Sequence, residues 1–234
     1  FDLLAAALTK PRFDEEPVTR IRGQILAGLR QEAEDPGSVA GKTLMKALFP
    51  KHPYGRPGSG TVKSVATITQ DDLKNFVKRR LARNNLVVGI VGDISKKEAA
   101  AFLSTTFGGL PRNAAPWTLP VAVAGAAGKT IVVKKPVPQS SIMYAHEGFK
   151  RDDPDFFAAF LVNHILGGGS FTSRLYQNIR EKRGLVYSIS SYLHPMDWAG
   201  LVAGSGGTAN ARVGETVTLL REEWNRIAKD GITK

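Results

Sequence analysis

The stretch Gly167–Tyr192 reads GGGSFTSRLYQNIREKRGLVYSISSY and decides the fold of this 234-residue chain. Three consecutive glycines allow the backbone to approach a neighbouring element or an extended peptide closely. The residues Phe171–Arg183 predict a polar helix, Gly184 ends it, and a strand is predicted over Leu185–Tyr192. The stretch therefore predicts a glycine loop, a helix and a strand in direct succession.

Two side chains of this stretch are candidates for chemistry. Arg180 lies late in the predicted helix, and Tyr187 lies on the strand that follows. Both donate hydrogen bonds, and two donors placed around a helix end can converge on one acceptor. The same residues also fit a surface arginine and a half-buried strand tyrosine, so their chemistry leaves both interpretations open.

The segments on either side of this stretch predict a sheet with helices packed on it. Upstream, strands are predicted over Lys129–Lys135 and Gln139–His146, and the helix predicted over Pro154–Leu166 is apolar on so many sides that we expect it to be buried. Downstream, a strand over Gly200–Gly204 precedes a long amphipathic helix. Its apolar positions repeat every 3.6 residues: Val213, Val217, Leu220, Trp224 and Ile227. This order predicts the α+β class, with helices on a mainly antiparallel sheet.

The first half of the chain predicts helices and one buried strand. Apolar spacing indicates helices over Asp14–Arg30 and Ser38–Leu48. Thr69 and Ser95 each stand three residues before an acidic residue, which is the capping-box pattern of a helix start. The apolar run Leu86–Val91 (LVVGIV) predicts a buried strand.

Composition excludes several classes of protein. A hydrophobic content of 42% is typical of a globular chain, and no apolar run approaches the roughly 18 residues of a membrane-spanning helix. The absence of cysteine excludes disulfides, thiolate metal sites and a cysteine nucleophile. The net charge of +11 is spread over several clusters without interleaved aromatics or a nucleic-acid-binding motif. We therefore interpret it as solvated surface and expect no nucleic-acid partner.

The chain carries no metal-binding motif of its own. None of its 4 histidines pairs with another at the i, i+4 spacing that places two imidazoles on one helix face. His146-Glu147 begins like a metalloprotease motif, but no second histidine follows. We therefore expect no metal ligands and no cofactor in this chain.

Motifs along nearly the whole chain resemble the insulinase/pitrilysin family of zinc peptidases, which includes the mitochondrial processing peptidase. They occur in the family's order: FDEEPVTRIRGQILAGLRQEAEDP, ALFPKHPYGRPGSGT, SVATITQDDLKNF and LVVGIVGDI, then the glycine loop and SRLYQNIREKRGLVYS. The resemblance implies repeated αβ domains of the processing-peptidase type. Residues 1–110 would be the trailing part of a first domain, 111–128 a linker rich in Pro, Ala and Gly, and 129–234 most of a second domain. It also implies two such halves around a chamber that binds an extended peptide as an added strand.

The resemblance gives roles to residues of the deciding stretch. Arg180 and Tyr187 match a pair that the family's non-metal half projects into the chamber, where it binds the substrate carbonyl and stabilises the developing oxyanion. A second candidate set matches a loop at the interface of the two halves and is expected to bind substrate or form that interface: Gly167, Gly168, Gly169 and Ser170.

Zinc in this family is held by His-x-x-Glu-His and by a glutamate on a later helix. The histidine motif would lie before Phe1. The run Val18–Arg22, where the glutamate is expected, contains none, and Glu15 and Glu16 lie one turn earlier. The resemblance therefore implies a subunit without zinc, whose HxxEH-bearing partner supplies the metal.

We accordingly predict the metal-free subunit of a two-chain, bacterial-type zinc peptidase, a heterodimer that acts on an extended peptide. Two alternatives stay open. One is a catalytically complete homodimeric peptidase whose HxxEH motif lies upstream of Phe1, and the other is a non-proteolytic structural core-type subunit. The sequence leaves the compartment open between the periplasm and the cytoplasm of a bacterium.

Overall fold

A computed structural model describes residues 1–232, which cluster into two compact units. The first unit comprises Phe1–Leu29 and Ser59–Thr118. The second comprises Arg30–Gly58 and the chain from Leu119 onward. The long helix α2 (Glu15–Glu34) therefore begins in the first unit and ends in the second.

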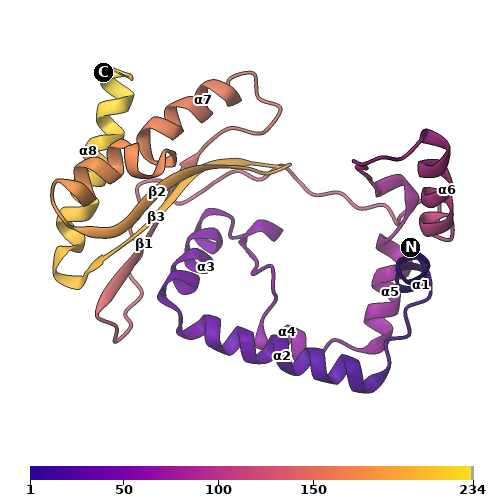
Figure 1. Cartoon of the computed structure of the whole chain (residues 1–234). Helices are drawn as coiled ribbons and strands as arrows, with labels where there is room; N and C mark the ends of the chain where they lie inside the picture. Colours follow the sequence, from indigo (N-terminus) through magenta and orange to yellow (C-terminus); the bar gives the residue numbers. More distant parts are fainter. Residues whose placement is uncertain (233–234) are drawn as a thin grey trace. The chain divides into compact units, whose positions relative to one another are not determined.

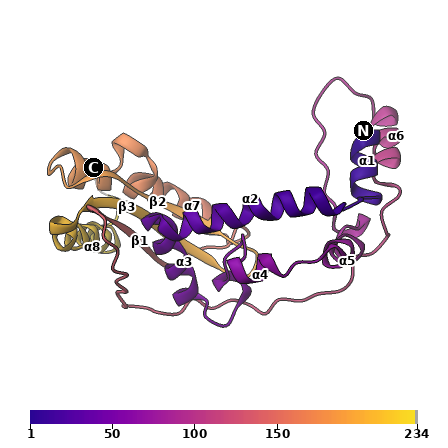
Figure 2. The same cartoon turned by 90° about the horizontal axis from the view of Figure 1, so that it is seen from below.

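The first unit is built from helices. Besides the start of α2 it contains α1 (Asp2–Thr9), α4 (Val62–Ala66), α5 (Gln70–Arg80) and α6 (Lys96–Phe107). Helices α1 and α6 lie side by side, as Figure 2 shows, with the rings of Phe1 and Phe102 4.5 Å apart.

The predicted capping boxes start two of these helices. The hydroxyl of Thr69 accepts a hydrogen bond from the Asp72 amide, and the Asp72 carboxylate accepts one from the Thr69 amide. Ser95 and Glu98 make the same reciprocal pair at the start of α6. Each pair satisfies two amides at the helix end, and both predictions are confirmed.

The predicted buried strand Leu86–Val91 is wrong for the described chain. The segment forms no strand, and the side chains of Val87 and Val91 are 96% and 103% exposed. An apolar run becomes a strand only where another strand completes its hydrogen-bond ladder, and residues 1–232 pair none with it.

A three-stranded antiparallel sheet forms the centre of the second unit. Its strands are β1 (Gln139–Glu147), β2 (Val186–Pro195) and β3 (Gly200–Ala209), in the order β1-β3-β2. This confirms the predicted α+β class with an antiparallel sheet. The strand predicted over Lys129–Lys135 is absent, because no described strand pairs with it; Lys135 instead donates to the carbonyl of Ala33 at 2.6 Å.

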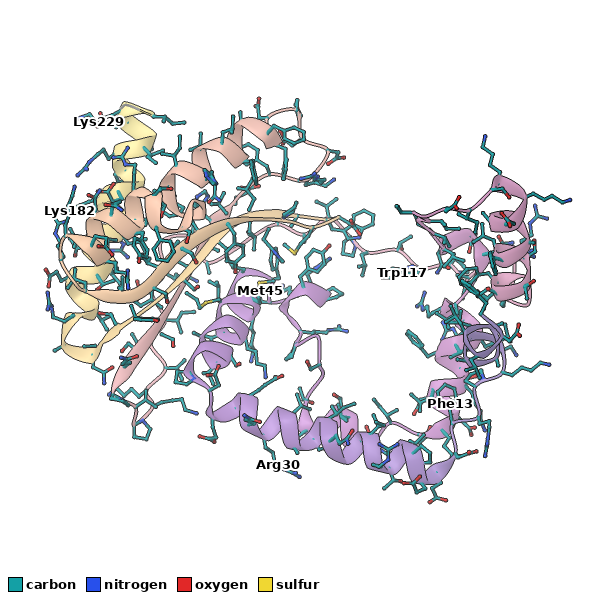
Figure 3. The ribbon with its side chains drawn as sticks, viewed as in Figure 1. Phe13, Arg30, Met45, Trp117, Lys182 and Lys229 are labelled. Atoms are coloured by element: carbon teal, nitrogen blue, oxygen red, sulfur yellow. The ribbon has the colours of Figure 1, made fainter. Side chains whose placement is uncertain are left out.

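Helices cover both faces of this sheet (Figure 1). On one face lies α3 (Pro36–Leu48), from which Met45, labelled in Figure 3, packs towards the strands. On the other face lie α8 (Val213–Asp230) and the helical turns of the deciding stretch. The core on that face is formed by Leu166, Leu175, Ile179, Leu185, Val186, Ile189 and Leu220. The long C-terminal helix and its apolar period are thus confirmed.

Helix α7 (Phe156–Asn163) corrects a third prediction. It forms within the predicted span and continues as a π-helical turn over His164–Gly168. However, the side chains of Phe157, Phe160 and Leu161 are between 51% and 69% exposed, so the helix is not buried on all sides. One face packs on β2, and the described chain offers nothing to cover the remaining sides.

Candidate functional site

The turn that carries Arg180 ends as the sequence predicts. Residues Tyr176–Glu181 form a π-helical turn rather than a regular α-helix. Gly184 has a φ of +59°, which a residue without a Cβ adopts freely, and its amide donates to the Arg180 carbonyl at 2.8 Å. This termination turns the chain into β2, so that Tyr187 follows Arg180 after only one short turn.

A β-bulge lies at the start of β2, directly beside Tyr187. Val186 pairs with Thr208 and Ile189 pairs with Gly206, so two residues of β2 face a single residue of β3. Both Val186 and Ile189 point into the core, whereas the Tyr187 side chain is 83% exposed. Bulges of this kind re-aim a side chain next to a functional site in many sheets.

The structure brings Arg180 and Tyr187 together. The Arg180 Cζ atom lies 5.6 Å from the centroid of the Tyr187 ring and 4.6 Å from that of Tyr176. Its Nη1 atom donates to the Glu181 carboxylate at 2.8 Å, and its side chain keeps 30% of its surface exposed. A guanidinium has five N–H donors, so the arrangement leaves several for a ligand. The pairing fits the predicted role without testing it.

The buried carboxylate of Glu223 holds the turn that carries Arg180 through two hydrogen bonds. Glu223 of α8 has a side chain that is 5% exposed. Its Oε2 atom accepts from Arg174 Nε at 3.2 Å, and its Oε1 atom accepts from Asn178 Nδ2 at 2.8 Å. Charge-assisted hydrogen bonds to a buried carboxylate are among the stronger ones, so α8 holds the segment just before Arg180 in place.

The three glycines serve close packing in this structure. A Cβ atom at Gly167 would lie 2.5 Å from Ser191 Oγ and 2.8 Å from Leu175 Cδ1. A Cβ at Gly168 would lie 2.9 Å from Asn163 Nδ2, and one at Gly169 would lie 2.8 Å from a carbonyl of the preceding turn. The chain therefore needs glycine here because the π-helical turn runs directly against β2.

Two buried side chains complete this packing. Asn163 at the end of α7 donates to the Ser191 carbonyl at 3.2 Å, and the Ser191 hydroxyl donates back to Asn163 Oδ1 at 2.7 Å. Both residues are buried. Sequence reasoning missed this pair, although an asparagine in a helix otherwise made of apolar residues is a signal for a buried hydrogen bond.

Ser170 differs from the glycines that precede it. Its side chain is exposed, and its φ of +51° is unusual for a residue with a Cβ. Its carbonyl accepts from the backbone amide and the hydroxyl of Ser173. No contact in the described chain tests the substrate or interface role expected of this loop.

Tyr144 on β1 shows why β3 is rich in small residues. The Tyr144 side chain crosses β3, and its hydroxyl donates a hydrogen bond to the Ser190 carbonyl on β2 at 2.7 Å. A Cβ atom at Gly204 would lie 2.3 Å from this side chain. Burial, with a smaller contribution from Tyr192, raises the pKa of Tyr144. The hydroxyl therefore stays protonated and keeps its role as a donor.

The donor set for zinc does not assemble in residues 1–232. No group of three or more His, Cys, Asp or Glu side chains there could hold a metal ion. His146 accepts from Trp224 Nε1 at 3.0 Å, and Glu16 in the first turn of α2 lies 3.6 Å from Arg20 Nε. Within the described residues, Glu16 therefore pairs with an arginine and not with other metal-ligating side chains.

The chain is similar to known peptidase sequences. Residues 67–234 match the family described as Peptidase M16 inactive domain. An uncharacterized zinc protease from Streptomyces coelicolor is 30% identical over 238 residues, which cover 99% of this chain and 52% of that protein. An uncharacterized zinc protease from Mycobacterium leprae is 28% identical, with 100% of this chain and 53% of that protein covered. The chain thus spans about half the length of the curated relatives it matches.

Solved structures give the same assignment of the fold. A peptidase M16 inactive domain from Pseudomonas fluorescens superposes with a TM-score of 0.91 at 35% identity, over 98% of this chain and 55% of that one. A chain of Complex III2 from Candida albicans and a protease from Helicobacter pylori each reach a TM-score of 0.81, at 19% and 18% identity, and share the fold. No helix in the described residues is both long and apolar enough to cross a bilayer.

Proposed function

Because this chain belongs to the M16 (insulinase/pitrilysin) peptidase family, as its motifs predicted, we propose that it is the metal-free member of a two-subunit zinc peptidase. It presents Arg180 and Tyr187 to a peptide bound in the chamber that it forms with an HxxEH-bearing subunit. Within this proposal, residues 1–110 are the end of one αβ repeat, 111–128 a linker and 129–234 most of a second repeat.

The observation that carries the proposal is the position of these two side chains. Arg180 packs its guanidinium against the Tyr187 ring at 5.6 Å, at a bulge where the tyrosine is 83% exposed. A single exposed tyrosine or arginine is ordinary on a protein surface. Here a turn that ends at Gly184 brings the two side chains into contact, which is a more specific arrangement.

The pair acts on the carbonyl oxygen of the peptide bond that is cleaved. Arg180 and Tyr187 each donate a hydrogen bond to this oxygen and so orient the carbonyl. As negative charge develops on the oxygen, both hydrogen bonds strengthen, and that from the cationic guanidinium strengthens more. Zinc, held by the partner subunit, supplies the Lewis acid and the activated water.

Two further observations support the metal-free assignment. The family description that matches residues 67–234 is that of the inactive domain. In addition, the helix expected to carry the ligand glutamate pairs Glu16 with Arg20.

The test is reconstitution of the full-length chain with an HxxEH-bearing M16 subunit, assayed with a quenched fluorescent peptide. We expect cleavage by the mixture, little cleavage by either chain alone, and well under one zinc per copy of this chain. Stoichiometric zinc with cleavage by this chain alone would instead identify a complete homodimeric peptidase.

A second outcome would also overturn the proposal. If the two chains assemble and the mixture cleaves the peptide no faster than the HxxEH-bearing chain alone, this chain is a structural subunit without a proteolytic role. The Tyr187→Phe variant sharpens the result, since it removes one hydroxyl from an exposed position. It should lower kcat and leave assembly unchanged.

A further inference from the structure

Tyr176 is a second aromatic residue in contact with the Arg180 guanidinium. The Arg180 Cζ atom lies closer to the Tyr176 ring, at 4.6 Å from its centroid, than to the Tyr187 ring, at 5.6 Å. The two rings come from different elements, the π-helical turn and β2. The guanidinium therefore contacts one buried ring, since Tyr176 is 8% exposed, and one ring open to solvent.

We propose that Tyr176 is a positioning residue for Arg180: its buried ring fixes the guanidinium beside Tyr187, so that both donors meet one carbonyl oxygen. This inference rests on the proposed function of the Arg180–Tyr187 pair. Tyr176 itself touches no substrate in this scheme and acts only through Arg180.

The physics of the contact favours this role. An arginine stacks on an aromatic face through its planar cation, and such contacts are stronger when they are partly withdrawn from water. The Cζ atom lies over the Tyr176 ring, and a guanidinium that stacks in this way keeps its N–H donors in its own plane, away from the ring. The stack therefore fixes the cation without consuming the donors that a carbonyl oxygen needs.

The environment of Tyr176 indicates that the ring, and not the hydroxyl, is what the site uses. The hydroxyl oxygen is buried and has no hydrogen-bond partner among the described residues. A buried hydroxyl without a partner costs stability, so packing alone would be served better by phenylalanine. The ring, in contrast, packs edge to face on Phe171 at 4.9 Å and faces Arg180 on another side.

The spacing along the chain explains how the contact forms. Tyr176 and Arg180 are four residues apart, which in a helical turn places their side chains on the same side. Glu181, the next residue, accepts from Arg180 Nη1 at 2.8 Å and limits rotation of the guanidinium about its stem. Ring and carboxylate together define one orientation for the cation.

The experiment compares Tyr176→Phe and Tyr176→Leu in the peptidase assembled with the HxxEH-bearing subunit. We expect the phenylalanine variant to keep kcat within about twofold of wild type, because it keeps the ring. The leucine variant should lower kcat about tenfold with KM unchanged, since the contact it weakens matters in the transition state. If leucine prevents assembly, Tyr176→Met, which keeps most of the volume without an aromatic face, takes its place.

A double variant separates positioning from general packing. In an Arg180→Gln background, Tyr176→Leu should lower kcat no further, because the group that Tyr176 positions is already gone. A further drop of tenfold there would overturn the inference, as would a phenylalanine variant as slow as the leucine variant. Phe171→Leu is the matched control: it removes a ring that contacts Tyr176 and not Arg180, and kcat should stay unchanged.

The same variants distinguish a failure of the proposed function of the Arg180–Tyr187 pair from a failure of the positioning role of Tyr176. If Arg180→Gln leaves kcat unchanged, the proposed function of the pair fails. If Arg180→Gln lowers kcat and a folded Tyr176→Leu variant does not, only the positioning role of Tyr176 fails.

Discussion

The glycine loop and the Arg180–Tyr187 pair lie within one stretch of sequence, yet the first is closely packed and the second is exposed to solvent. At Gly167 the backbone is pressed against Ser191, with no room for a single additional carbon atom. At Tyr187 the side chain stands almost fully in solvent above a bulge. One region is closed by its own contacts, and the other is open to a ligand.

This difference separates residues that affect the stability of the fold from residues that affect activity. A residue whose contacts are all internal affects stability when it is changed, and it reaches activity only through the fold. An exposed residue can be changed with little effect on stability, so a loss of activity on its substitution indicates a contact with the ligand. Substitutions in the two regions should therefore affect stability and activity separately.

The largest effect is expected from Arg180→Gln. The variant removes the charged donor, and kcat of the assembled peptidase should fall about 100-fold, as for loss of one oxyanion donor. The unfolding midpoint should shift little, because the side chain is partly exposed. Arg183→Gln is the control: it removes the same charge from an exposed residue that donates to the Asn178 carbonyl, and kcat should be preserved.

Gly167→Ala should show the reverse pattern. The added Cβ forces the π-helical turn away from Ser191 and Leu175, and the free energy of unfolding should fall by about 2 kcal/mol. Urea unfolding followed by circular dichroism measures it. Gly214→Ala, at a helix position with nothing within 4 Å of the new atom, should leave stability equal or slightly higher. Equal stability of both variants would show that the glycine loop is not closely packed.

Tyr187→Phe is expected to have a smaller effect on activity than Arg180→Gln. The ring and its contact with Arg180 remain, and only a neutral donor is lost, so kcat should fall about tenfold. The unfolding midpoint should match that of wild type because the hydroxyl lies in an exposed side chain. A midpoint lowered in parallel with kcat would place Tyr187 among the structural residues.

The smallest effect is expected at Ser170. Its φ of +51° costs a residue with a Cβ more than it costs glycine, so Ser170→Gly should raise the free energy of unfolding by at most about 1 kcal/mol. A decrease in stability measured by urea unfolding would show that the serine side chain makes a contact that outweighs the backbone strain.

Local patterns were sufficient for several parts of the fold. The capping boxes at Thr69 and Ser95 and the end of the helical turn at Gly184 all depend on residues within a few positions of one another. The apolar period of α8 likewise depends on one helix alone. Such features could be predicted because their causes lie next to them in the chain.

Features with distant causes could not be predicted in this way. Leu86–Val91 and Lys129–Lys135 have the composition of strands, but a strand requires a partner, and the described residues supply none. The exposed phenylalanines of α7 reflect the same limit, since burial depends on what packs against the helix. The bulge that returns Ile189 to the core face arises only in the pairing of β2 with β3.

The candidate site was predicted in part for the same reason. Arg180 and Tyr187 were identified through the family motif, and their proximity followed from a short turn. Tyr176 was missed because its relevance depends on a ring lying beside a guanidinium, which spacing along the helix permits but does not require. Glu223 was missed because it reaches the site from a helix about 40 residues later.

The role of the pair in cleavage is measured by kcat of the Arg180→Gln, Tyr187→Phe double variant assembled with an HxxEH-bearing M16 subunit. We expect a rate at least about 100-fold below wild type, with an unfolding midpoint within about 2 °C of that of wild type. A rate equal to wild type in a fully assembled complex would contradict the account, because the pair would then have no part in cleavage.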